Sequence, residues 1–198
     1  MGNAIEIYSA HLKISSEAAE CYARKLLEEM AHRMQMTVIR LVGYTVVKTV
    51  NRIFDGVFVN AAQFRELREL SKNDNIIFIP THRAYMDFLL VSLLCYGYDV
   101  PLPAIAAGMD FMHSKVMGET LRRCGAFFIR RHFGADQLYW ALFTEYVQSQ
   151  LVSSDYPIEF FIEGTRSRSG KSLFPKYGLL QVLMEPFFRK QIYNVVCC

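Results

Sequence analysis

The chain has 198 residues, of which 52% are hydrophobic and 21% are charged. This length accommodates one domain with a substantial core, and this composition excludes an intrinsically disordered protein. The formal net charge of +3 is too small to indicate a nucleic-acid-binding protein, although clustered cations would suit a small anionic substrate or an anionic membrane surface.

The five cysteines show no CxxC spacing. This pattern argues against a disulfide framework and against a zinc site. We therefore expect no metal site and a reducing compartment.

The first part of the chain predicts two helices. Ser15 or Ser16 can cap a helix that runs to about Met36, with an apolar stripe along one face. The next helical segment, residues 37–54, is more apolar. Its only charges are those of Arg40, Lys48 and Arg52.

The charges within residues 37–54 argue against a transmembrane helix. Two interpretations stay open for this segment. It can lie in a membrane interface with its basic residues toward the lipid headgroups, or it can be a core helix of an N-terminal helical layer. We treat residues 1–60 as an N-terminal helical segment with a possible membrane-associating role.

From residue 61 onward, helix-like and strand-like segments alternate. The predicted strands are residues 75–79, 103–107, 126–130, 158–162 and 192–196. The predicted helices are residues 61–72, 84–96, 112–123, 135–151 and 176–190. This alternation indicates an α/β fold with a mostly parallel central sheet flanked by helices and preceded by the N-terminal helical segment. In such sheets, ligands bind beyond the carboxyl ends of the strands.

A histidine and an aspartate follow the first predicted strand. His82 comes two residues after Pro80, and Asp87 lies five residues further on. Inside one helix, this separation would place the two side chains about 140° apart. With His82 in a turn before the helix, its imidazole can fold back so that Asp87 accepts a hydrogen bond from one ring nitrogen, which leaves the other nitrogen free as a base. A chance pair without function is the alternative interpretation.

Two polar clusters follow other predicted strands. Arg130 and Arg131 end the third strand. The loop after the fourth strand contains Glu163, Gly164, Arg166 and Arg168. Arginine presents a planar fork of donors that matches phosphate oxygens two at a time, so a phosphate is the favoured ligand. Adjacent residues of a strand point to opposite faces, and we therefore expect only one of Arg130 and Arg131 to reach a shared pocket. A solvated loop is the alternative explanation of these cations.

Taken together and in order, three sequence blocks carry a resemblance to a known family. The blocks are His82-x4-Asp87, Gly125-x3-Ile129-Arg130-Arg131 and Phe161-x-Glu163-Gly164-Thr165-Arg166-Ser167-Arg168. They resemble the first three blocks of the glycerolipid acyltransferases. Within that superfamily, the sequence of residues 106–111, 138–141 and 184–188 is most similar to the dihydroxyacetone phosphate acyltransferases of peroxisomal ether-lipid synthesis.

The resemblance implies transfer of a fatty acyl group from acyl-CoA to the sn-1 hydroxyl of dihydroxyacetone phosphate, with glycerol 3-phosphate as the nearest rival acceptor. It implies that His82 is the general base, that Asp87 orients it, and that Glu163 and Gly164 occupy catalytic-block positions. It further implies a binding site for the acceptor's phosphate. The arginines of that site would be Arg130 or Arg131, together with Arg166 and Arg168. No cofactor is implied, because acyl-CoA is a co-substrate.

The same resemblance implies that residues 61–198 form an acyltransferase domain that is incomplete at its C-terminus, because a fourth block should begin about where this sequence stops. An inactive fragment that only binds a membrane or another subunit is therefore an alternative. The implied location is the matrix face of the peroxisomal membrane, with peripheral membrane association and another ether-lipid enzyme as a possible partner. Residues 195–198 do not form a peroxisomal targeting tripeptide.

Overall fold

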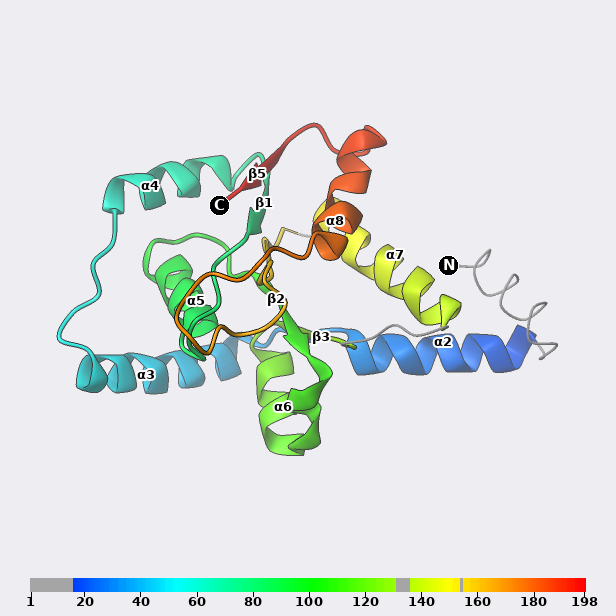
Figure 1. Cartoon of the computed structure of the whole chain (residues 1–198), viewed down its shortest axis with the longest axis horizontal. Coiled ribbons are helices and arrows are strands. Elements are labelled where there is room, and N and C mark those ends of the chain that lie inside the picture. The colour runs from blue at the N-terminus through cyan, green and yellow to red at the C-terminus, as the bar shows by residue number, and fades with distance from the viewer. Residues whose placement is uncertain (1–15, 131–135, 154) are drawn as a thin grey trace.

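A computed structural model of the chain describes residues 16–130, 136–153 and 155–198. Its helices are α2 (Ser16–Met30), α3 (Met36–Ile53), α4 (Ala61–Leu70), α5 (Asp87–Gly97), α6 (Lys115–Arg123), α7 (Gln137–Ser153) and α8 (Gly178–Phe188), with a 3-10 helix, η1 (Met109–His113). Its strands are β1 (Asn75–Phe78), β2 (Ala104–Gly108), β3 (Ala126–Ile129), β4 (Ile158–Glu159) and β5 (Val195–Cys197). Figure 1 shows these elements in space.

The five strands form one sheet in the order β3-β2-β4-β1-β5, and every described pairing is parallel. The α/β fold class with N-terminal helices is thus confirmed. β1 lies beside β4, with Ile77 opposite Ile158 and Phe78 opposite Glu159. Because neighbouring parallel strands end at the same edge of a sheet, the loops that follow β1 and β4 are neighbours in space.

Helices cover both faces of the sheet. On one face, Ile77 and Ile158 belong to a large core that also contains buried residues of α2, α7 and α8. On the other face, Ile76 and Phe78 belong to a smaller core with Leu67 of α4 and Cys95 of α5. Successive residues of β1 thus point to opposite faces, as expected for a strand buried on both sides.

The predicted N-terminal helix ends earlier than expected. It begins at Ser16, stops at Met30 rather than near Met36, and is followed by a separate helix, α3. The cause is pairing of the intervening segment with α6, because the amides of Arg33 and Gln35 donate to the carbonyls at the end of that helix, 3.0 and 2.9 Å away. The other proposed cap, Ser15, lies outside the described residues.

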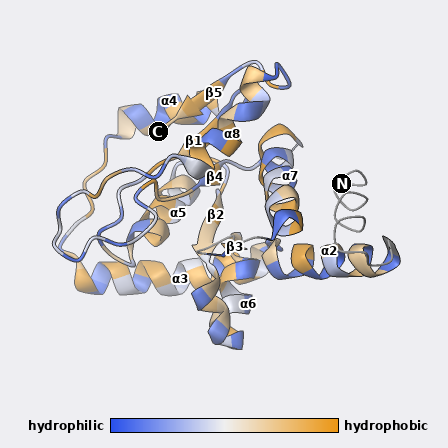
Figure 2. Ribbon diagram, turned by 45° about the vertical axis from the view of Figure 1, so that its right-hand side comes forward, coloured by the Kyte–Doolittle hydropathy of each residue, from blue (hydrophilic) through white to orange (hydrophobic). Residues whose placement is uncertain are grey.

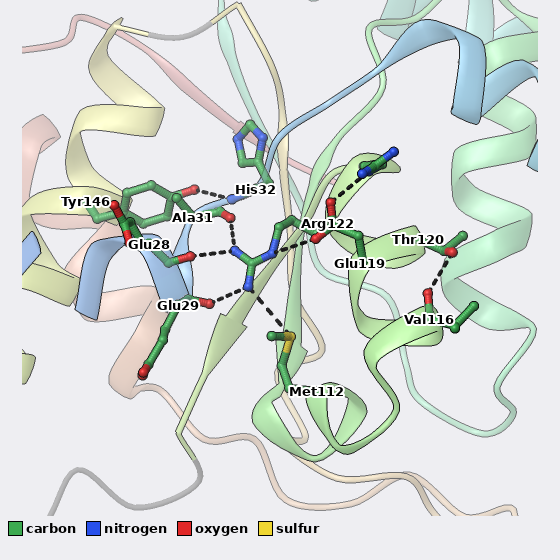
Figure 3. A network of polar contacts seen from close by, with 11 residues as sticks. Glu28, Glu29, Ala31, His32, Met112, Val116, Glu119, Thr120, Arg122 and Tyr146 are labelled. Atoms are coloured by element: carbon green, nitrogen blue, oxygen red, sulfur yellow. Dashed lines mark hydrogen bonds and ion pairs between the residues drawn. The ribbon is translucent and has the colours of Figure 1, made fainter. Parts of the chain in front are cut away.

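A buried arginine fixes the end of α2. The Arg122 guanidinium is 4% exposed and donates to the carbonyls of Glu28 and Glu29 at 3.0 and 2.7 Å, and also to that of Ala31 (Figure 3). These carbonyls are among the acceptors that a helix C-terminus leaves without intrahelical donors. The cation also complements the negative end of the helix dipole, so Arg122 ties α2 to α6.

Two strand predictions differ from the structure by more than one residue at an end. The fourth strand was expected over residues 158–162 but comprises only Ile158 and Glu159, because the chain turns where the Gly164 amide donates to the Phe161 carbonyl. The last strand begins at Val195 rather than at residue 192. The helix expected from residue 84 begins at Asp87, so the loop that carries His82 extends to Met86.

Within the part of the chain that the structure describes, no helix is long and apolar enough to span a bilayer.

The capping role of Arg122 predicts a loss of stability in Arg122→Met. This change keeps much of the apolar stem but leaves three carbonyls without the buried donor that binds them, so we expect the free energy of unfolding to fall by about 2–3 kcal/mol. Urea denaturation measures the loss. The matched control is Arg123→Met, because Arg123 is 42% exposed and pairs with Glu119 on the surface. Equal losses in the two variants would contradict the assigned role.

Candidate active site

The loop between β1 and α5 brings His82 and Asp87 together. The His82 Nδ1 atom lies 3.2 Å from Asp87 Oδ2. The same oxygen accepts from the backbone amides of Arg83 and Ala84 at 2.7 and 2.8 Å. The contact expected from the sequence is therefore present, and it arises because His82 precedes the helix while Asp87 begins it.

The hydrogen bonds to Asp87 favour its ionised form. Burial acts to raise the pKa of this carboxyl, but hydrogen bonds from the Ala84 and Arg83 amides and from His82 outweigh burial and lower the pKa. Asp87 is therefore negatively charged at neutral pH. A carboxylate on Nδ1 holds the imidazole in the tautomer whose Nε2 atom can accept a proton.

The loop that follows β4 packs against the histidine. The rings of His82 and Phe161 are stacked, with their centroids 4.1 Å apart and their planes 26° from parallel. The Ser167 amide donates to the His82 carbonyl at 2.9 Å. Residues from two distant parts of the sequence thus hold the imidazole from two sides, as the adjacency of β1 and β4 requires.

Arg166 lies next to the histidine loop. Its guanidinium carbon is 4.5 Å from the centroid of the Tyr85 ring, and Tyr85 stands between His82 and Asp87 in the sequence. A stacked guanidinium keeps its N–H groups in the plane of the fork, where they remain available to an oxyanion. Arg168, two residues further on, is exposed.

Glu163 and Gly164 form the turn between these groups. Glu163 is 3% exposed, and neither of its carboxylate oxygens has a hydrogen-bond partner among the described residues. Gly164 has φ +65°, a conformation that favours glycine. A Cβ atom at this position would lie 2.9 Å from Cδ of Lys176, so the space beside Gly164 is used by a lysine side chain.

Arg130 is engaged elsewhere. Its guanidinium pairs with Asp136 at 3.2 Å and lies over the Tyr139 ring, with 4.3 Å between the guanidinium carbon and the ring centroid. Asp136 also accepts from the Tyr22 hydroxyl at 2.9 Å. Arg131 lies outside the described residues.

The strand order separates Arg130 from His82. Three strand spacings between β3 and β1 correspond to about 14 Å across the sheet. The structure thus assembles His82, Asp87 and Arg166 and leaves Arg130 at a distance.

The sequence analysis assigned no role to four residues that shape this site. They are Tyr85, Phe161, Ser167 and Lys176. Tyr85 and Phe161 act through their ring faces and Ser167 acts through its backbone amide, so none of the three carries a local sequence signal of its role. Lys176 directly precedes Tyr177 and α8, and a cation so close to the arginine-rich loop was a signal that could have been used.

The described residues contain no group of three or more His, Cys, Asp or Glu side chains that could hold a metal ion.

Comparison with known proteins shows what the chain resembles. Residues 61–197 match the sequence model of a family described as Acyltransferase. The chain is 43% identical to the dihydroxyacetone phosphate acyltransferase of Homo sapiens over 198 aligned residues, which cover 97% of this chain and 29% of that protein. It is 46% identical to the protein of the same name from Oryctolagus cuniculus, over 86% of this chain and 25% of that protein.

A second group of relatives carries another name. The chain is 38% identical to the glycerol-3-phosphate acyltransferase of Ectopseudomonas mendocina, over 93% of this chain and 22% of that protein. The chain therefore spans less than a third of the length of each of these relatives.

Proposed function

Because the chain belongs to the acyltransferase family, we propose that it transfers a fatty acyl group from acyl-CoA to the sn-1 hydroxyl of dihydroxyacetone phosphate. The observation that carries this proposal is the His82–Asp87 pair with the Arg166 guanidinium beside its loop. The relatives named dihydroxyacetone phosphate acyltransferase support this choice of acceptor. A relative named glycerol-3-phosphate acyltransferase makes glycerol 3-phosphate the second candidate acceptor.

His82 is the general base of the proposed reaction. Its Nε2 atom takes the proton of the acceptor hydroxyl as that oxygen attacks the thioester carbonyl carbon. The tetrahedral intermediate then collapses, the carbon–sulfur bond breaks, and the imidazolium returns the proton to the leaving thiolate. The charge of Asp87 stabilises the imidazolium between these two steps. The reaction needs no resident metal or cofactor, because a thioester is already activated and a thiolate is a good leaving group.

Arg166 and Arg168 bind the phosphate of the acceptor in this proposal. Arg166 is favoured by its contact with Tyr85, a residue of the loop that carries the base. Binding the phosphate there positions the hydroxyl for attack, and this contribution of proximity accelerates the reaction. Arg130 would have to leave Asp136 to take part, so we assign the phosphate first to the loop arginines and only second to Arg130 or Arg131.

Glu163 and Gly164 have supporting roles. The buried Glu163 carboxylate, free of protein partners among the described residues, is available to a cation or to a donor group of the acceptor. Gly164 leaves room for Lys176, which adds a positive charge beside the turn that precedes Arg166.

Residues 61–198 constitute the acyltransferase domain in this proposal, and residues 1–60 precede it. We place the protein at the matrix face of the peroxisomal membrane, together with another enzyme of ether-lipid synthesis. This placement is supported only by the relatives named dihydroxyacetone phosphate acyltransferase.

The outer surface of α3 supports peripheral membrane association. Leu41 and Tyr44 are 69% and 64% exposed, and Phe58, in the segment after the helix, is fully exposed. Exposed cations lie among them on α3, namely Arg40, Lys48 and Arg52. Figure 2 shows hydrophobic residues along much of α3, interrupted by hydrophilic ones. A helix surface that combines exposed aromatic and aliphatic side chains with cations suits an anionic lipid surface.

The first test measures acyl transfer from palmitoyl-CoA by the purified chain, with dihydroxyacetone phosphate and glycerol 3-phosphate in parallel. We expect His82→Ala to reduce kcat by a factor of about 10²–10⁴, the usual contribution of a general base. His113→Ala, at an exposed position in η1, is the matched control and should retain activity. Absence of turnover from a folded chain would favour the alternative, an inactive fragment that only binds a membrane or another subunit.

Arg166→Ala should raise KM for the phosphorylated acceptor by roughly 10- to 100-fold, because it removes a charge-assisted hydrogen bond. KM for acyl-CoA should change much less. Lys171→Ala removes a cation from the same exposed loop and serves as the control. Equal effects of Arg166→Ala on both substrates would rule out the phosphate-binding role.

Membrane association is tested by co-sedimentation with vesicles. We expect the chain to bind vesicles of phosphatidylcholine and phosphatidylserine more strongly than vesicles of phosphatidylcholine alone. The double variant Leu41→Ser, Tyr44→Ser should weaken binding severalfold. The control is Tyr193→Ser, which removes a 97% exposed ring from the segment between α8 and β5, on the other side of the molecule from α3 (Figures 1 and 2). Equal losses in the two cases would exclude α3 as the membrane-binding surface.

A further inference from the structure

A glutamate lies in the middle of the sheet. Glu159 belongs to β4, where it is opposite Phe78 of β1 on one side and Ile105 of β2 on the other. Its side chain is fully buried. Neither of its carboxylate oxygens has a hydrogen-bond partner among the described residues.

The Glu159 side chain faces the core beneath α5. Its neighbour Phe78 belongs to the smaller core, which also contains Cys95 of α5. Glu159 interacts electrostatically with Asp87 and with Cys95, both of which lie on α5. The two flanking strands, β1 and β2, carry no titratable side chain. Asp87 is therefore the charged group of the proposed active site that this buried carboxyl faces.

The two carboxyl groups have opposite environments. Burial, and then the negative charge of Asp87, raise the pKa of Glu159 to about 8. The pKa of Asp87 is lowered, since hydrogen bonds from the Ala84 and Arg83 amides and from His82 outweigh its burial. At neutral pH the pair therefore carries one negative charge, and that charge is on Asp87.

We propose that Glu159 is a positioning residue for the His82–Asp87 pair, an inference that rests on the proposed acyl transfer. As a neutral carboxylic acid beneath α5, Glu159 leaves Asp87 as the only negative charge of the Glu159–Asp87 pair. When Glu159 loses its proton, a second negative charge appears behind the first and the coupling of Asp87 to His82 is lost.

The geometry indicates which contact breaks first. Like charges in a buried site repel strongly, and the repulsion acts on the Asp87 carboxylate. Asp87 is held by two short hydrogen bonds, at 2.7 and 2.8 Å, from backbone amides and by the longer 3.2 Å contact with His82 Nδ1. The longest of these contacts, the one with His82, is the weakest. The imidazole would thus lose its orienting partner while the loop kept its shape.

Stability alone does not explain a carboxyl at this position. A buried polar group without partners opposes folding, and an apolar side chain of similar size usually packs there at lower free energy. Because the pKa of Glu159 is raised, this destabilisation of the folded state depends on pH. Between the ordinary pKa of an unfolded glutamate and about pH 8, folding requires Glu159 to bind a proton, so stability falls as pH rises through this window.

The decisive experiment follows the ¹³C signal of the His82 imidazole by NMR as pH is raised from 6 to 10. The signal is assigned by its loss in His82→Ala. In the wild-type chain we expect an alkaline step centred near pH 8, from ionisation of Glu159. Glu159→Gln cannot ionise at this position, so the step should vanish. Glu159→Leu, a second variant with a better packed core, should lose it as well.

The matched control is Glu185→Gln. Glu185 lies on α8, where it accepts from Gln148 and pairs with Arg189, and α8 packs on the opposite face of the sheet. The alkaline step should persist in this variant. A wild-type signal without the step, or a step that survives in Glu159→Gln and Glu159→Leu, would overturn the proposal.

Activity provides the second measurement. With a pKa of about 8, the neutral fraction of Glu159 falls roughly tenfold between pH 7 and pH 9, so kcat/KM should fall by a similar factor in the wild-type chain. In Glu159→Gln the ratio of kcat/KM at pH 9 to that at pH 7 should be about 1, while Glu185→Gln should behave as wild type. If the ratio in Glu159→Gln were the same as in the wild-type chain, the positioning role would be refuted. If the wild-type chain shows no turnover, the proposed acyl transfer fails, and the NMR titration still decides whether Glu159 acts on His82.

Discussion

A single oxygen atom, Asp87 Oδ2, determines the shape of the loop that carries His82. It accepts from the amides of Arg83 and Ala84 and also faces the Nδ1 atom of the histidine. The two amide hydrogen bonds fold the loop back onto the first turn of α5 and stabilise the negative charge. That same charge orients the imidazole. Because one atom serves both purposes, the loop conformation and the orientation of the base depend on the same carboxylate.

The sheet topology supplies the second half of the site. β4 lies between β1 and β2, so the loop after β4 reaches the histidine loop directly. Phe161 stacks on His82, Ser167 donates to its carbonyl, and Arg166 lies over Tyr85. Three independent contacts thus join two loops whose strands are hydrogen-bonded neighbours. An arginine at the end of β3, three strands away from β1, has no comparable access, and Arg130 pairs with Asp136 instead.

The sequence predicted the features that depend on local patterns. The alternation of segments predicted the α/β fold, and the five-residue spacing predicted the contact between His82 and Asp87. Features that depend on distant main-chain atoms were not predictable. The end of α2 at Met30 depends on pairing with the end of α6, and no residue near Met30 signals it.

Buried titratable side chains were the other features that local patterns missed. Glu159 occupies one position of an otherwise apolar strand pattern, and its burial follows only from the placement of β4 at the centre of the sheet. Arg122 lies among the exposed charges of a short helix, and only the position of α2 reveals that it is buried. In both cases a polar side chain is covered by elements that are remote in the sequence, so no local rule for charged residues applies.

The Arg122 contacts also constrain the amino-acid sequence of the two segments that they join to different degrees. The guanidinium binds carbonyl oxygens of residues 28, 29 and 31, and every amino acid presents that same oxygen. Side chains at these three positions can therefore change through evolution without disturbing the junction, whereas position 122 has no equivalent substitute for a planar fork of donors. The Arg122 contacts thus constrain one side chain of this junction. A comparison of related sequences should find little variation at position 122 and more variation at positions 28, 29 and 31.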